Sequence, residues 1–224
     1  MAFALLVLFG SAMGLCVRKL RLLQLCGYSQ AADRLYRRCA SVLGGGAYAA
    51  MLAQMLILLA AGKLTWRSGL PLHLCSLMGL LSLPMLLSRN PLLWQVSLCL
   101  GVPGALLALV FPAVAETPWP TLTELAFCAM HCCVLLAPLL PLCLGARPTV
   151  TGVLWASGAL VLMGCAALTA NALTGGNYFF LNGSPIPWMN RWGVAAWRVM
   201  LVCAALLVLL VEGVLVRICQ AKSS

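Results

Sequence analysis

Residues 150–172 read VTGVLWASGALVLMGCAALTANA, a run of apolar and small residues without a charged side chain. A helix needs about 20 mostly apolar residues to cross the hydrocarbon core of a bilayer, which is about 30 Å thick. This run therefore predicts a transmembrane helix. Similar runs recur along the chain, and together they predict an all-α polytopic bundle of about seven transmembrane helices in one membrane domain, residues 1–224. The runs cover residues 2–17, 40–61, 70–87, 92–110, 122–144, 150–172 and 193–216.

The composition of the whole chain agrees with embedding in a membrane. Of the 224 residues, 63% are hydrophobic and only 8% are charged, and the mean hydropathy is +1.04. Soluble domains contain about 45–50% apolar and about 25% charged residues. Seven spans with short connections leave no room for a separate soluble catalytic domain.

The basic residues are placed unevenly. The net charge is +10, and six of the fourteen Lys and Arg residues lie between Arg18 and Arg38, directly after the first apolar run. Multi-pass membrane proteins keep such clusters on the cytoplasmic side, so this placement argues against nucleic acid as a partner. It predicts an outside N-terminus and a cytoplasmic C-terminus. The leucines among these bases predict an amphipathic segment on the cytoplasmic surface.

Twelve cysteines are present, most of them single residues inside apolar runs. In a small secreted protein such a number would indicate disulfides. Here we interpret them as small hydrophobic residues at helix interfaces. No C-x-x-C or zinc-type spacing occurs, and the sequence predicts neither a metal site nor a cofactor.

Polar side chains inside a membrane span are costly, so each one is a candidate functional residue. They occur at the start of the third run, within the fifth, and where the sixth run passes into a loop. With the N-terminus outside, all of them fall in the outer half of the bilayer, where they could line one cavity. The candidates are His73, Cys75, Ser76, Glu124, His131, Asn171, Thr174, Gly175, Gly176 and Asn177.

Two arrangements of these residues would support catalysis. In the first, Cys75 meets His131 across helices, and the imidazole takes the thiol proton to create a thiolate nucleophile. In the second, His73 and His131 act as acid and base on water or a substrate hydroxyl. Glu124 would lie near the mouth of the cavity in either case.

The stretch Thr174-Gly175-Gly176-Asn177-Tyr178 predicts a turn after the sixth helix. Its glycines could free backbone N–H groups to face a ligand. The alternative is an ordinary loop that ends a helix. Both interpretations remain open at this point.

Four short motifs and one histidine carry a resemblance to a known family. They are Leu70-Pro71-Leu72-His73-Leu74-Cys75-Ser76, Gly101-Val102-Pro103-Gly104-Ala105, His131, Arg147-Pro148-Thr149, and Leu173-Thr174-Gly175-Gly176-Asn177-Tyr178-Phe179-Phe180-Leu181-Asn182. Together they resemble the YwaF-like bacterial integral membrane proteins, over most of the chain. The resemblance implies a multi-pass protein of the bacterial cytoplasmic membrane. That family is distantly similar to eukaryotic transmembrane protein 164, regarded as a membrane acyltransferase that acts on ether phospholipids through a Cys-His pair.

The resemblance implies that His131 is the catalytic base. The cysteine of the relative would stand where Leu72 stands here, and Cys75 could supply the thiol from one helical turn away. The related androgen-induced hydrolases use Thr and His, so the nucleophile varies on such a scaffold. In this interpretation His73, Asn171 and Asn177 would position the substrate or stabilise an oxyanion.

We therefore predict a membrane-embedded lipid-modifying enzyme, an acyltransferase or lipid hydrolase, with a phospholipid or acyl-chain substrate drawn from the bilayer lipids. The alternative is a non-enzymatic carrier or lipid-binding protein with a polar cavity. Transporters are often built from paired halves with broken helices. No internal repeat is evident in this chain, which favours the enzyme.

Overall fold

The computed structural model describes residues 1–221, which form helices and no β-strand. Six helices are long and apolar enough to cross a membrane, and α3 is a shorter apolar helix. This confirms the all-α bundle of about seven membrane helices. The helices are α1 (Ala2–Leu25), α2 (Ser29–Ala60), α3 (Leu74–Ser88), α4 (Pro91–Val96) continued by α5 (Val102–Val110), α6 (Pro120–Cys143), α7 (Val150–Thr174) and α8 (Gly193–Ala221).

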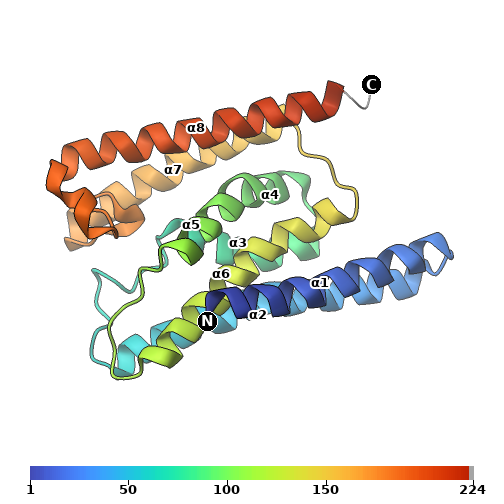
Figure 1. Ribbon diagram of the computed structural model, residues 1–224, viewed down its shortest axis with the longest axis horizontal. Helices are drawn as coiled ribbons and strands as arrows, with labels where there is room; N and C mark the ends of the chain where they lie inside the picture. The colour runs from blue at the N-terminus through green and yellow to red at the C-terminus, as the bar shows by residue number, and fades with distance from the viewer. Residues whose placement is uncertain (222–224) are drawn as a thin grey trace.

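The connections gather at two ends of the molecule (Figure 1). The α2–α3, α5–α6 and α7–α8 connections, residues 61–73, 111–119 and 175–192, form what we call the histidine end. The α1–α2 turn, the α3–α4 turn and the α6–α7 connection, residues 26–28, 89–90 and 144–149, form the arginine end. Which of these ends faces the cytoplasm stays a prediction.

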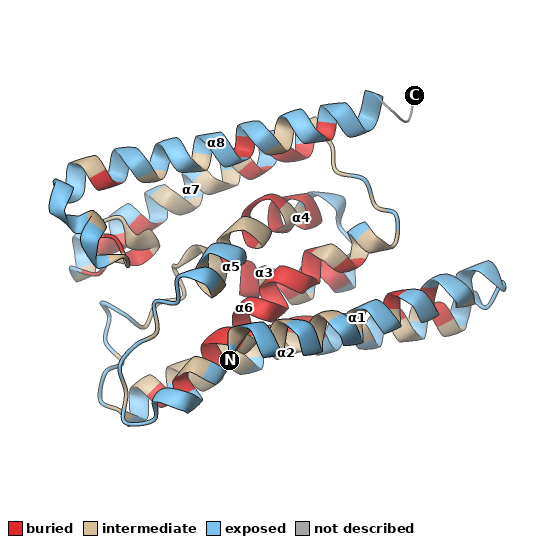
Figure 2. Cartoon of the chain, viewed as in Figure 1, coloured by how far each residue is buried: buried red, intermediate tan, exposed pale blue. Residues whose placement is uncertain are grey.

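Helix α6 is the centre of the bundle. It packs against α1, α2, α3 and α5, and Figure 2 shows buried residues concentrated on α6, α3 and α4. Helix α8, in contrast, exposes most of its apolar surface. In a bilayer this surface would contact lipid tails. A polar residue on the buried face of α6 therefore lies inside protein at membrane depth.

The first two helices differ from their predicted runs. Helix α1 continues to Leu25 and α2 begins at Ser29, so the basic residues extend two antiparallel helices and do not form a separate surface segment. The reason is packing, because Leu20 of α1 and Tyr36 of α2 belong to one buried cluster. The prediction of a separate amphipathic segment on the membrane surface was therefore wrong.

Prolines and caps shape the other helices. A π-helical turn, Ser97–Gly101, lies between α4 and α5, just before Pro103. Because Pro103 has no N–H to donate, a change in the hydrogen-bond pattern just before it is expected. Pro138 and Pro141 both lie inside α6 without ending it. The Pro138 carbonyl accepts from Trp94 Nε1 at 2.8 Å.

The motif around Thr149 joins α7 to α4. The Thr149 side chain accepts from Gly152 N and caps α7. The backbone N–H and the hydroxyl of Thr149 both donate to Gln95 Oε1, at 2.7 and 2.8 Å. This part of the resemblance motif therefore has a structural role.

Helix α3 begins four residues later than its predicted run. Leu70 to His73 are not helical, and His73 precedes the helix with an extended backbone (φ −77°, ψ 148°). At 1.5 Å per residue its 15 residues span about 22 Å, which is less than the roughly 30 Å hydrocarbon core. The non-helical segment that carries His73 is therefore expected to lie at membrane depth.

Helices α2 and α3 approach closely at Gly44. A Cβ at this position would lie 2.6 Å from Leu83 Cα, which is backbone and cannot move without shifting α3. We expect Gly44→Ala to lower stability by about 1–3 kcal/mol because of this overpacking. The measurement is the melting temperature of the purified protein in detergent. Gly45→Ala is the matched control, because a Cβ there meets open space; equal melting of the two variants would contradict the prediction.

Candidate functional site

His131 lies on α6 with one ring nitrogen engaged and the other free. Its side chain is 4% exposed, and its ring packs against Phe127 with the centroids 4.1 Å apart. Nδ1 lies 2.8 Å from the Phe127 carbonyl oxygen. A carbonyl can only accept, so Nδ1 carries the proton and Nε2 presents a lone pair. Within residues 1–221 no hydrogen bond occupies Nε2, so this nitrogen could accept a proton or a hydrogen bond.

His73 lies in a box of aromatic rings. Its ring centroid is 5.5 Å from that of Tyr178 and 5.0 Å from that of Phe180. Its Nδ1 is buried and has no hydrogen-bond partner in the described part of the chain. Each of the two histidines of the chain therefore has an unused ring nitrogen.

The turn that supplies the aromatic box is strained. Phe179 and Phe180 both have positive φ, 57° and 55°. A left-handed backbone costs a residue with a Cβ roughly 1–2 kcal/mol, and it persists only where the surroundings enforce it. Here Trp197 Nε1 of α8 donates to the Phe180 carbonyl at 2.6 Å. This bond helps to hold the Phe180 ring against His73.

Asn171 and Tyr178 connect this turn to the rest of the histidine end. Asn171 Nδ2 donates to the Tyr178 carbonyl at 3.0 Å, and Asn171 Oδ1 accepts from Tyr178 N at 2.7 Å. The Tyr178 side chain is fully buried, and its hydroxyl donates to Trp66 O and accepts from Leu70 N. Irregular backbone is tolerated at membrane depth only where its polar groups are satisfied within protein. Asn171 meets this need for Tyr178.

The other predicted residues of this loop also serve its own fold. Asn177 Nδ2 donates to Gly183 O, and Asn177 Oδ1 accepts from Asn182 N. The Thr174 hydroxyl donates to Ala170 O and accepts from Gly176 N. Gly175 ends α7 with φ +68°. The geometry thus favours a helix-ending loop over a turn whose N–H groups face a ligand.

Cys75, Ser76 and Glu124 lie nearby without being joined to the histidines. Cys75 opens α3, and its Sγ would be 3.5 Å from a Cβ placed at Gly104, so the thiol points towards α5. Within residues 1–221, no hydrogen bond links Cys75 to His131, and none involves the Ser76 hydroxyl or the Glu124 carboxylate. All three residues are half-buried.

Metal binding has no geometric support in the described residues. No group of three or more His, Cys, Asp or Glu side chains among residues 1–221 is placed to hold an ion. The twelve cysteines all lie in this part of the chain, and none forms a disulfide.

Two arginines and the aromatic box were absent from the predicted site. Arg67 Nε donates to Thr174 O, and Arg198 donates to Leu181 O and Asn182 Oδ1. Each arginine directly follows a tryptophan near the end of a predicted helix, and this pattern could have marked both as anchors at the membrane interface. Nothing in the sequence indicated that consecutive phenylalanines would adopt left-handed conformations.

Comparison with known proteins yields one match. A family model described as the TMEM164 family matches residues 1–216. No curated protein and no solved structure matches this chain. The matched residues include both histidines, the loop after α7 and nearly all of α8.

Proposed function

This chain belongs to the TMEM164 family and is a multi-pass membrane protein, and on that basis we propose that it is a lipid-modifying enzyme, an acyltransferase or lipid hydrolase, with His131 as its base. One observation carries the proposal. The bond from His131 Nδ1 to the Phe127 carbonyl leaves the Nε2 lone pair free inside the bundle. A free imidazole lone pair suits proton transfer.

The proposed reaction acts on an acyl ester. His131 Nε2 takes the proton of an attacking hydroxyl group, whose oxygen forms a bond to the acyl carbonyl carbon. The bond from that carbon to the lipid's glycerol oxygen breaks, and His131 returns the proton to the departing oxygen, which leaves as an alcohol. Water as the attacking group gives hydrolysis, and a hydroxyl of a second lipid gives acyl transfer. His73 would hydrogen-bond the substrate through its unpartnered nitrogen.

The position of this site supports a lipid as the substrate. His73 precedes the short helix α3 and is expected at membrane depth, as is His131 on the central helix. An acyl chain could reach both groups sideways from the bilayer, without leaving the hydrocarbon. A soluble substrate would have to enter against the apolar surroundings.

The position of Cys75 favours attack by a hydroxyl over attack by its thiol. The thiol points towards α5 and has no hydrogen bond to His131. We expect Cys75→Ala to change the turnover rate by less than about threefold, because the thiol takes no part in the proposed proton transfer by His131. The assay follows release or transfer of a labelled acyl chain from phospholipid by protein in vesicles. A loss as large as that of a histidine variant would instead identify Cys75 as the nucleophile.

The same assay tests the proposal as a whole. Wild-type protein is expected to turn over the labelled phospholipid, and the double variant His73→Gln/His131→Gln is expected to be inactive. The carrier alternative predicts a different result: the protein moves intact lipid between vesicles, and the double variant does so equally well. That result, with no lysolipid or transferred acyl chain, would contradict our proposal.

A further inference from the structure

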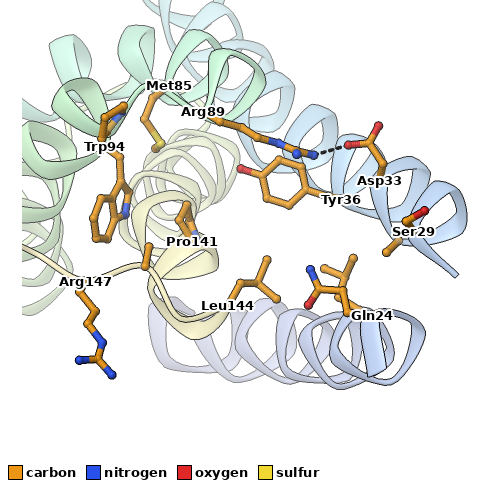
Figure 3. A pocket seen from close by; sticks show the side chains of 14 residues that line it. Gln24, Ser29, Asp33, Tyr36, Met85, Arg89, Trp94, Pro141, Leu144 and Arg147 are labelled. Carbon is orange, nitrogen blue, oxygen red and sulfur yellow. Dashed lines mark hydrogen bonds and ion pairs between the residues drawn. The ribbon is translucent and has the colours of Figure 1, made fainter. Parts of the chain in front are cut away.

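A cavity of about 510 Å³ lies at the arginine end, away from the histidines. Figure 3 shows its walls, which come from the ends of α1, α2, α3, α4 and α6. One part of the lining is apolar, and it includes Leu20, Met85, Trp94, Pro141 and Leu144. The remaining part is polar or charged, and it includes Gln24, Ser29, Asp33, Arg89 and Arg147. The lining therefore offers both the apolar and the polar groups that an amphiphile requires.

Of the two arginines that line the cavity, one has no ion-pair partner among residues 1–221. Arg89 is paired with Asp33, and its guanidinium lies 4.3 Å from the centroid of the Tyr36 ring. Asp33 also accepts from Arg37 at 2.9 Å. Arg147 is exposed, and within residues 1–221 it has neither a hydrogen bond nor an ion pair. The lining therefore holds a positive charge that no protein group neutralises.

The surroundings of the cavity are also basic. Arg21 of α1 donates to the Cys143 carbonyl at the end of α6, next to Leu144 of the wall. Arg18 and Lys19 precede it on α1, and Arg34 and Arg38 lie on α2. Clustered Lys and Arg beside membrane helices attract anionic lipids, and basic pockets between such helices bind their headgroups.

We propose that this cavity binds one anionic phospholipid, with its phosphate at Arg147 and its acyl chains along the apolar wall. A lipid whose headgroup carries a net negative charge complements the unneutralised arginine. His73 lies at the other end of α3, about 22 Å away along that helix, and His131 lies ten residues before Pro141 on α6, about 15 Å away at 1.5 Å per residue. The proposal is independent of the catalytic function, because binding here requires neither histidine.

The test uses the full chain, purified and delipidated in a neutral detergent. It is titrated with a phosphatidylglycerol brominated on its chains and, separately, with a phosphatidylcholine brominated in the same way. Because Trp94 lines the cavity, we expect the phosphatidylglycerol to quench fluorescence saturably, with the quenched component missing in Trp94→Phe. Arg147→Gln is expected to weaken the binding about tenfold, as the loss of a charge-assisted hydrogen bond predicts.

Two further variants keep the test decisive. Arg217→Gln removes an exposed arginine of α8 that does not line the cavity, and it is expected to leave binding unchanged. Ala146→Leu adds volume to the wall without changing charge, and it is expected to weaken binding even if Arg147→Gln folds poorly. Equal affinity for both lipids, or unchanged binding in Ala146→Leu, would overturn the proposal. Complete displacement by inorganic phosphate alone would overturn it in favour of a site for free anions.

Discussion

Replacement of His131 by alanine is expected to lower the rate of lipid turnover by about 10²–10⁴-fold, the usual contribution of a positioned general base. The reason is that Nε2 carries the free lone pair, while Nδ1 is fixed by the Phe127 carbonyl. His131→Gln should be nearly as inactive, because glutamine can donate to that carbonyl but cannot take a proton at neutral pH. The measurement is the single-turnover rate of acyl release or transfer in vesicles.

The control for His131 is its neighbour on the same helix. Cys132 is fully buried, so Cys132→Ala also removes core volume from α6 but leaves the base in place. This variant is expected to keep most of the activity and to lose only modest thermal stability. Similar losses of activity in Cys132→Ala and His131→Ala would show that the rate depends on the packing of α6, and His131 would then not be the base.

The fold was largely predictable because the lengths and separations of the apolar runs constrain membrane helices strongly. Backbone groups in hydrocarbon must be satisfied within each segment, so a long apolar run has few alternatives to a helix. The prediction was wrong in a segment expected outside the hydrocarbon core. The basic end of α1 was expected on the membrane surface, but Leu20 there packs against α2. Tertiary packing of this kind leaves no mark in a hydropathy pattern.

The candidate site was predictable only in part. His131 and His73 stood out because an ionisable side chain in an apolar run is costly and needs a reason. The roles of Asn171 and Asn177 were not evident, because a sequence does not reveal which backbone groups of a loop are buried. Both amides bond to loop backbone at distances of 2.7–3.0 Å. The cavity at the arginine end was missed because Asp33 and Arg89 meet only in the folded chain.

The second large effect is expected from Asn171→Ala. The substitution leaves the buried N–H of Tyr178 without a partner, whereas the Tyr178 carbonyl keeps the bond that it accepts from Leu181 N at 3.3 Å. An unsatisfied buried N–H costs about 1–3 kcal/mol. The variant should therefore be destabilised by roughly 1–3 kcal/mol if the Tyr178 N–H stays dry. Asn171→Asp is expected to be milder, since its carboxylate still accepts from Tyr178 N. Thermal unfolding in detergent measures both, with Thr169→Ala, an exposed hydroxyl on the same helix, as the control.

Asn171→Ala should also disturb the aromatic rings that surround His73. Tyr178 and Phe180 hold their rings beside His73, and Phe180 keeps an unfavourable backbone only while its neighbours enforce it. Without the Asn171 clamp the turn is expected to relax, so amide hydrogen exchange in residues 175–183 should accelerate and lipid turnover should fall. Fast exchange with unchanged turnover would mean that the aromatic box is dispensable, and His131 would then act without a positioned His73. Unchanged exchange would contradict the role of Asn171 itself.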